Sequence, residues 1–160
     1  MRYSYLLPVV LTLAVGWHPG ASAEPERASG PALGYLNALR QQAGLPALAV
    51  DAELERAAVD HARYLSRHGG DPHRQQPGLS GFTGREAGDR ALAAGYPSRS
   101  VSENVSRGQR DASRSIDDLM SALYHRFGYL VGAVTHTGIG QGLGDTRAAR
   151  TCVYVMGNQY

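Results

Sequence analysis

Apolar residues recur at helical spacing in three parts of this 160-residue chain. Leucines three residues apart predict a first helix at about 31–43, with polar residues on its outer side. A longer stripe of leucine and alanine predicts the strongest helix at about 52–68, and Asp51 precedes it as an N-cap. A third stripe predicts a helix at about 115–124, capped by Ser115. The pattern therefore predicts amphipathic helices packed around an apolar core.

Two short apolar runs near the C-terminus have the length and composition of strands. Residues 137–143 and 151–156 are predicted to be strands joined by a polar turn at 144–146. The second run is apolar on both faces, which is typical of a central strand. Earlier in the chain, proline and glycine punctuate residues 71–88 and predict a long ordered loop, a kind of segment that is often functional in compact domains. A short helix is expected at 89–94.

The first residues have the pattern of a secretory signal. Arg2 supplies a positive charge, and residues 6–17 form an apolar run too short to span a bilayer comfortably. Ala21-Ser22-Ala23 then provides the small residues that a signal peptidase reads. We therefore expect residues 1–23 to be a signal peptide cleaved after Ala23, and the mature protein to be secreted or periplasmic.

Beyond the cleavage site, the polar residues 24–30 are expected to form a flexible leader and residues 31–160 a single domain. No later segment is apolar enough to cross a membrane, so no transmembrane segment is expected after cleavage. One cysteine remains, Cys152, which we interpret as a small apolar residue in a strand. We expect packing or a metal, rather than a disulfide, to hold the domain together.

Composition narrows the class of protein further. Hydrophobic residues make up 42% and charged residues 19% of the chain, as in ordinary folded domains. The formal net charge of +2 creates no strong basic field, so nucleic acid is not expected as a partner. The sequence also lacks the signatures of zinc proteases, serine hydrolases, P-loop proteins and dinucleotide-binding proteins, and it has no CxxC pair.

Three polar residues in separate segments are the candidates for chemistry. His73 lies in the long loop, Glu103 follows a turn, and His125 stands at the end of the third predicted helix. Two imidazoles and a carboxylate can hold a divalent metal such as zinc with an open position, or act without a metal as general acid and base. All three are therefore candidate metal ligands and candidate catalytic residues. His61, in the apolar stripe of the long helix, is interpreted as a satisfied core residue.

Seven short motifs follow one another along residues 31–157. They are Leu36-Asn37-Ala38-Leu39-Arg40 with Gly44-Leu45-Pro46-Ala47-Leu48, Ala58-Val59-Asp60-His61-Ala62-Arg63-Tyr64-Leu65, Asp71-Pro72-His73, Arg90-Ala91-Leu92-Ala93-Ala94-Gly95-Tyr96, Ser102-Glu103-Asn104-Val105, Tyr124-His125-Arg126, and Gly138-Ile139-Gly140 with the final strand. No single motif is specific, but chance rarely produces this order. The order resembles the CAP superfamily, or SCP domain (cysteine-rich secretory, antigen 5, pathogenesis-related 1), and most closely its bacterial YkwD-like branch.

The resemblance implies an α/β fold, namely a three-layer α-β-α sandwich with a small central antiparallel sheet and long loops. It implies that His73, Glu103 and His125 meet in a cleft, where some family members bind zinc or another divalent ion. It also places His61 near the core. One departure is Leu119, which stands where the family usually carries a tryptophan.

A second departure concerns the acids of the cleft. Animal and plant members of the family supply a second glutamate, for which Asp118 and Glu86 are the candidates in this sequence. Without that residue, the resemblance implies a cleft of three residues whose fourth metal position is left to water or stays empty.

Three functions remain open from the sequence. The first is a secreted binding protein whose His/Glu cleft takes a divalent metal or a small or lipidic ligand, with an unknown small molecule, lipid or cell-envelope component as partner and no assigned reaction. The second is a hydrolase of the cell envelope that uses the cleft with or without a metal. The third is a structural or interaction domain in which the polar cluster has no chemical role.

Overall fold

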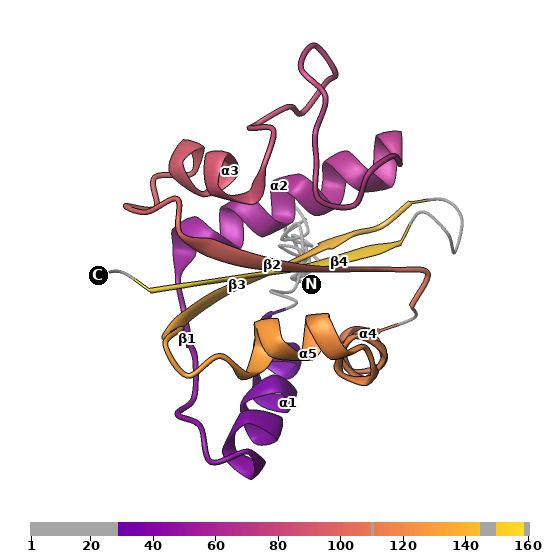
Figure 1. Cartoon of the computed structure of the whole chain (residues 1–160). Coiled ribbons are helices and arrows are strands. Elements are labelled where there is room, and N and C mark those ends of the chain that lie inside the picture. The colour runs from indigo at the N-terminus through magenta and orange to yellow at the C-terminus, as the bar shows by residue number, and fades with distance from the viewer. Residues whose placement is uncertain (1–28, 110, 145–149, 159–160) are drawn as a thin grey trace, which may run out of the picture.

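A four-stranded sheet forms the middle layer of the domain (Figure 1). In spatial order the strands are β1 (Ala49–Val50), β3 (His136–Gly142), β4 (Thr151–Gly157) and β2 (Val101–Arg107). β3 pairs with β4 and β4 with β2 in antiparallel fashion, whereas the two-residue β1 runs parallel to β3. The three long strands thus form the expected antiparallel sheet, and β1 adds a short parallel edge.

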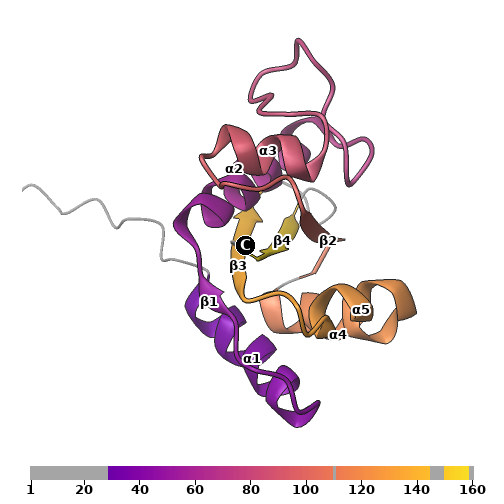
Figure 2. The same ribbon diagram turned by 60° about the vertical axis from the view of Figure 1, so that its left-hand side comes forward.

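Helices cover both faces of this sheet (Figures 1 and 2). On one face lie α2 (Ala52–His68) and α3 (Ala87–Ala93). On the other lie α1 (Ser29–Gln42), α4 (Ala112–Ser121) and α5 (Leu123–Leu130). The predicted three-layer α-β-α sandwich is therefore confirmed, and β2 forms one edge of its sheet.

The computed structural model describes residues 29–109, 111–144 and 150–158. The predicted signal peptide and its cleavage site lie outside these residues, as does most of the predicted leader. Within the described ranges, no helix is long and apolar enough to cross a membrane.

The long helix α2 has the bounds that the sequence predicts. The Asp51 carboxylate accepts a hydrogen bond from the Leu54 backbone N–H at 2.9 Å, as an N-cap does. α2 packs directly against β3 because glycines line the contact. A Cβ on Gly140 would lie 2.2 Å from the Ala58 carbonyl carbon, so only glycine allows this approach.

The third helix differs from the prediction in its cap and its length. Asp111, not Ser115, caps α4, because its carboxylate accepts from the Arg114 backbone N–H at 2.9 Å. Ser115 is buried inside the helix, where its hydroxyl accepts a hydrogen bond from Tyr154 at 2.9 Å. The chain then becomes extended at Ala122, with φ −92° and ψ 122°, before α5 begins. One predicted helix is therefore two.

Each face of the sheet has its own apolar cluster. The cluster under α2 and α3 contains Leu54, Ala58, Ala62, Tyr64, Leu65, Ala91, Tyr96, Val105, Val153 and Val155. The cluster under α1, α4 and α5 contains Ala32, Leu36, Leu48, Ala112, Ile116, Leu119, Tyr129, Ile139, Cys152, Tyr154 and Met156. Cys152 is a buried free thiol in β4, which confirms its interpretation as a small core residue.

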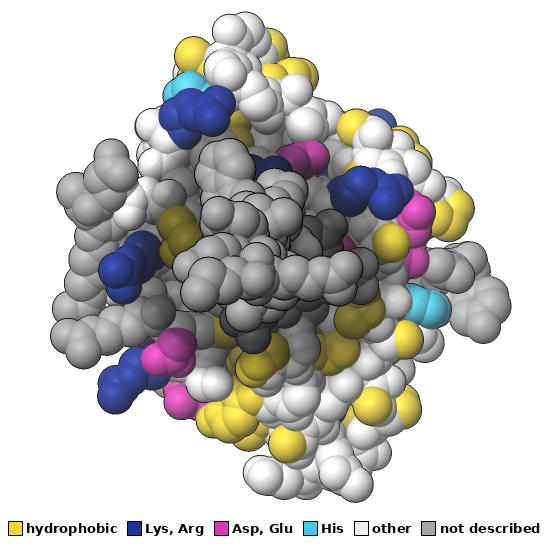
Figure 3. All heavy atoms as spheres, turned by 180° about the vertical axis from the view of Figure 1, so that it is seen from behind, with side chains coloured by type: hydrophobic (Ala, Val, Ile, Leu, Met, Phe, Trp, Pro, Cys, Tyr) yellow, Lys and Arg dark blue, Asp and Glu magenta, His cyan; other side chains and the backbone are white. Residues whose placement is uncertain are grey.

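Figure 3 shows the side of the molecule that lies behind the view of Figure 1. On this side, arginines are scattered rather than gathered in one patch.

Candidate functional site

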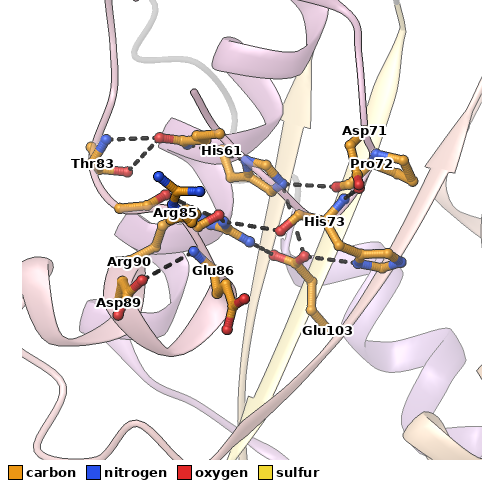
Figure 4. Close-up of polar contacts among 12 residues, drawn as sticks. His61, Asp71, Pro72, His73, Thr83, Arg85, Glu86, Asp89, Arg90 and Glu103 are labelled. Carbon is orange, nitrogen blue, oxygen red and sulfur yellow. Dashed lines mark hydrogen bonds and ion pairs between the residues drawn. The ribbon is translucent and has the colours of Figure 1, made fainter. Parts of the chain in front are cut away.

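The edge strand β2 divides its polar side chains between the two faces of the sheet. Side chains alternate along a strand, so Glu103 and Asn104 point in opposite directions. Glu103 faces α2, α3 and the long loop, and its side chain is only 3% exposed. Asn104 faces α5 and is buried as well. The candidate site is built around the buried carboxylate of Glu103 (Figure 4).

Arg90, from α3, is the cation that neutralises this carboxylate. Its Nη2 lies 2.7 Å from Glu103 Oε2, and its side chain is 1% exposed. Its Nη1 donates to the carbonyl oxygens of His73, Arg85 and Gly84 at 3.3, 3.1 and 3.5 Å. A buried charge is costly unless it is paired and hydrogen-bonded, and this guanidinium meets both conditions.

His73 lies on the solvent side of the same carboxylate. Its Nδ1 donates to Glu103 Oε1 at 3.0 Å, since a carboxylate can only accept. This hydrogen bond raises the pKa of His73, against a smaller opposing effect of burial. The side chain is 46% exposed, and Nε2 has no partner among the described residues. One ring nitrogen is therefore fixed and the other is available.

His61 lies behind this pair and is completely buried, which confirms its interpretation as a core residue. Its Nε2 donates to the Pro72 carbonyl at 2.9 Å, so its Nδ1 accepts from the Gln75 side-chain amide at 3.1 Å. Burial lowers the pKa of His61 to about 4, against the opposing effect of Glu103 3.8 Å away. A neutral imidazole thus holds the carbonyl next to His73 and helps to set the position of the loop.

A hollow of about 400 Å³ opens beside His73. It is lined by His73, Arg74, Glu86, Ala87, Gly88, Arg99, Val101 and Glu103. Arg74 and Glu86 form an exposed ion pair at 3.5 Å, and Arg99 pairs with Asp89. Charged groups therefore dominate the walls. Of the two candidates for a second acid, Glu86 lies in this hollow, whereas Asp118 is on α4, where Gln109 donates to it.

The structure brings His73 and Glu103 together, but it places His125 on a different layer. His125 lies in α5, and its backbone carbonyl accepts from the Asn104 amide at 2.8 Å, on the opposite face of β2 from the Glu103 carboxylate. In the part of the chain that the structure describes, no group of three or more His, Cys, Asp or Glu side chains is placed to hold a metal ion. Leu119, in the position of the expected tryptophan, belongs to the apolar cluster on this second face.

The residues present do not fit a divalent metal centre as they are arranged. His73 and Glu103 supply two donors that touch, fewer than the three protein ligands of an open zinc site. The Arg90 guanidinium also lies 2.7 Å from the carboxylate, where a metal would bring a second positive charge. The zinc site therefore stays a prediction from sequence.

Sequence reasoning missed the role of Arg90. The residue belongs to one of the motifs that carry the family resemblance, but nothing in its spacing distinguishes a buried arginine from an exposed one. Gln75 was missed for the same reason. It is 1% exposed and joins His61 to the backbone N–H of Thr83, from which its carbonyl oxygen accepts at 2.7 Å.

Fold and site together define a CAP-type domain, with a charged hollow at the edge of its sheet. The family model of the cysteine-rich secretory proteins (CAP) matches residues 33–156, so the chain belongs to the CAP family. No curated protein matches the chain.

Solved structures of bacterial proteins share the fold. An extracellular protein with an SCP domain from Bacillus anthracis is 21% identical with a TM-score of 0.64, over 80% of this chain and 39% of that one. An outer surface protein from Borrelia burgdorferi is 16% identical with a TM-score of 0.68, over 86% and 96%. A cysteine-rich secretory protein from Staphylococcus aureus is 15% identical with a TM-score of 0.54, over 81% and 37%. The chain thus spans about two fifths of the length of the first and third.

Proposed function

We propose that this CAP domain is an exported binding protein whose hollow beside His73 takes a small polar ligand. One observation carries the proposal. The hollow of about 400 Å³ has His73 in its wall, with one imidazole nitrogen fixed on a buried carboxylate and the other unpartnered among the described residues. Small-molecule sites are usually preformed and concave, and the polar groups fixed in their walls orient the ligand.

The chemistry of the walls favours a polar ligand over a lipidic one. Arg74, Glu86 and Arg99 surround His73, and their side chains offer both signs of charge. A hydrocarbon chain placed there would separate these groups from water without replacing their hydrogen bonds, which is costly. A ligand with hydroxyl, amide or carboxylate groups replaces them.

Export is supported by the signal pattern of residues 1–23. It is also supported by the descriptions of two structural neighbours, one as extracellular and one as an outer surface protein. The ligand is therefore expected to be available outside the cytoplasm, among components of the cell envelope or the medium.

The test is a titration followed by NMR of the histidine side chains. We would add N-acetylglucosamine, alanyl-alanine, succinate or inorganic phosphate and record the imidazole signals of His73. At least one probe is expected to shift them. Calorimetry, which does not need the His73 signal, should then show that His73→Ala removes binding of that probe and that His68→Ala, outside the hollow, does not. Binding that survives both His73→Ala and Arg74→Gln contradicts the site. A fall in melting temperature in these variants, with no probe bound to wild type, favours the purely structural role.

A hydrolase is the second candidate, because His73 has the geometry of a general acid or base. Its Nδ1 is held by Glu103 and its Nε2 faces outward, as in sites where a carboxylate orients a catalytic imidazole. Water would be the nucleophile. Turnover of ester, amide or glycoside substrates that disappears in His73→Ala and in Glu103→Gln, with the circular dichroism spectrum unchanged, would support this function.

A further inference from the structure

Each oxygen of the Glu103 carboxylate already has a hydrogen-bond partner in the protein. Arg90 holds Oε2 at 2.7 Å and His73 holds Oε1 at 3.0 Å. The two partners of the ion pair are 1% and 3% exposed, so water contributes little to their solvation. In such surroundings the charge-assisted hydrogen bond between them is strong, and either partner alone is expensive to bury.

The same guanidinium also fixes the loop that carries His73. Arginine has five N–H donors in a rigid plane, and here they reach the carboxylate on one side and the carbonyls of His73 and Arg85 on the other. Arg90 therefore positions both members of the His73–Glu103 pair. A metal ion in a His/Glu cleft would have these two roles, namely to neutralise the carboxylate and to fix the ligands.

The Arg90 side chain is enclosed by the protein, because it is 1% exposed and its guanidinium makes four hydrogen bonds. The loop closes over the start of α3 at Gly84, where an added Cβ would lie 2.7 Å from Asp89 Cβ and 2.8 Å from the Arg90 backbone nitrogen. For a divalent ion to reach Glu103, it would have to share the carboxylate with this buried guanidinium, 2.7 Å from Oε2. Two adjacent positive centres on one buried carboxylate repel each other strongly, because little water screens them.

We propose that Arg90 replaces a metal ion as the cation of this cleft, so that His73 and Glu103 form a metal-free pair positioned by arginine. Metal affinity should then be latent in the pair and blocked by Arg90. His73 and Glu103 are the donors once the guanidinium is gone, with water in the remaining positions around the ion. The inference does not depend on which ligand the hollow takes.

The test measures zinc binding by calorimetry on the exported chain, purified without a polyhistidine tag. Wild type is expected to show no zinc site that depends on His73. Arg90→Gln removes the positive charge and should bind zinc with a dissociation constant at least ~10-fold lower than that of any residual zinc binding by wild type. The imidazole signals of His73 should shift as zinc is added to this variant, and His73→Ala in the same background should abolish the gain.

Arg74→Gln is the matched control, because it removes an arginine from the same hollow that has no contact with Glu103 in the described structure. It is expected to leave zinc binding as in wild type. If Arg90→Gln does not fold, Arg90→Lys and Arg90→His keep the test decisive. Lysine retains the charge and should remain zinc-free, whereas histidine supplies a donor and should bind zinc.

Two results would overturn the proposal. The first is zinc binding by wild type at one site that is lost in His73→Ala, since Arg90 would then not exclude the metal. The second is folded Arg90→Gln and Arg90→His proteins that bind zinc no better than wild type. A gain of equal size in Arg74→Gln also contradicts it, because the effect would then come from net charge alone.

Discussion

The two faces of the sheet bury their polar side chains in different ways, and two adjacent residues of β2 show the difference. Under α2 and α3, Glu103 is buried as an ion, with Arg90 and His73 on its two oxygens. Under α4 and α5, Asn104 is buried as a neutral amide that donates to the carbonyl of His125. An ion pair and two histidines lie beside the hollow, whereas on the opposite face the buried side chains of Asn104 and Arg40 donate to neutral backbone carbonyls.

The tyrosines of the second face fit this contrast. Tyr129 and Tyr154 meet edge to face with ring centroids 5.4 Å apart, and the Tyr154 hydroxyl donates to Ser115. Burial raises the pKa of both phenols, so they stay neutral at any physiological pH. These two tyrosines therefore serve as neutral packing groups, whereas His61 and His73, the two histidines with shifted pKa values, lie under α2 and α3. Substitutions on the two faces should accordingly have different consequences.

The largest effect is expected from removing one partner of the buried ion pair. Arg90→Met leaves the Glu103 carboxylate in the protein interior without a cation, which should cost about 4 kcal/mol of unfolding free energy. The double variant Arg90→Met with Glu103→Leu should recover most of that loss, because no charge is left unpaired. Urea unfolding of wild type, both single variants and the double variant gives the unfolding free energies for a double-mutant cycle. Additive losses would show that the two charges are not coupled.

The next effect concerns the close contact between α2 and β3. Gly140→Ala places a Cβ 2.2 Å from the Ala58 carbonyl carbon, and the overpacking should cost about 3 kcal/mol. Gly34→Ala is the matched control on the other face, because nothing lies within 4 Å of an added Cβ in α1. Since alanine favours helices over glycine, this variant should gain up to about 1 kcal/mol. Chemical denaturation measures both, and equal effects would contradict the assigned packing.

Local signals in the sequence were enough for the parts of the fold that depend on local chemistry. The bounds of α2 follow from its apolar stripe and from Asp51, whose cap needs only a residue three positions away. β2 was missed because buried polar residues, Glu103 and Asn104 among them, interrupt the alternation that identifies a half-exposed strand. Its place at the sheet edge is decided by pairing with β4, which no local pattern contains.

The candidate site was only partly predictable for the same reason. The family order of motifs selected His73 and Glu103, which do meet. It could not show that Arg90 would be buried, because the carboxylate that holds it comes from a strand 13 positions later in the chain. Nor could it place His125, whose side of the sheet depends on the break between α4 and α5 at Ala122.

A pH dependence of intermediate size should come from His61. Its pKa is about 4 in the folded protein and 6.5 ordinarily. Between these two pH values the imidazole is therefore protonated in the unfolded chain but neutral in the folded protein. The contribution of His61 to the free energy of unfolding is therefore fully present above pH 6.5. It is lost as the pH falls toward 4, and the loss is about 2 kcal/mol at pH 5. His73 opposes this, because its raised pKa makes protonation stabilising as the pH falls.

The contribution of His61 can be isolated by comparing unfolding free energies of wild type and His61→Gln between pH 7 and pH 5. The charged groups that face this imidazole, Glu103, Arg90 and His73, are present in both proteins. Wild type should lose stability faster than the variant as the pH falls. Parallel curves would mean that His61 is not kept neutral by burial, and the contrast between the two faces would then be weaker than the structure indicates.

The smallest effect, and the sharpest test of independence, is at Asn104. Asn104→Ala removes the hydrogen bond to the His125 carbonyl and should cost about 1 kcal/mol, a typical value for one buried hydrogen bond. Faster hydrogen exchange should be confined to α5, while α2 and the imidazole signals of His73 stay unchanged. Glu103 directly precedes Asn104 in β2, so a shift of the backbone at Asn104 would reach the other face most directly through this residue. If His73 shifts in this variant, the second layer tunes the hollow, and His125 acts on the site through the strand without touching it.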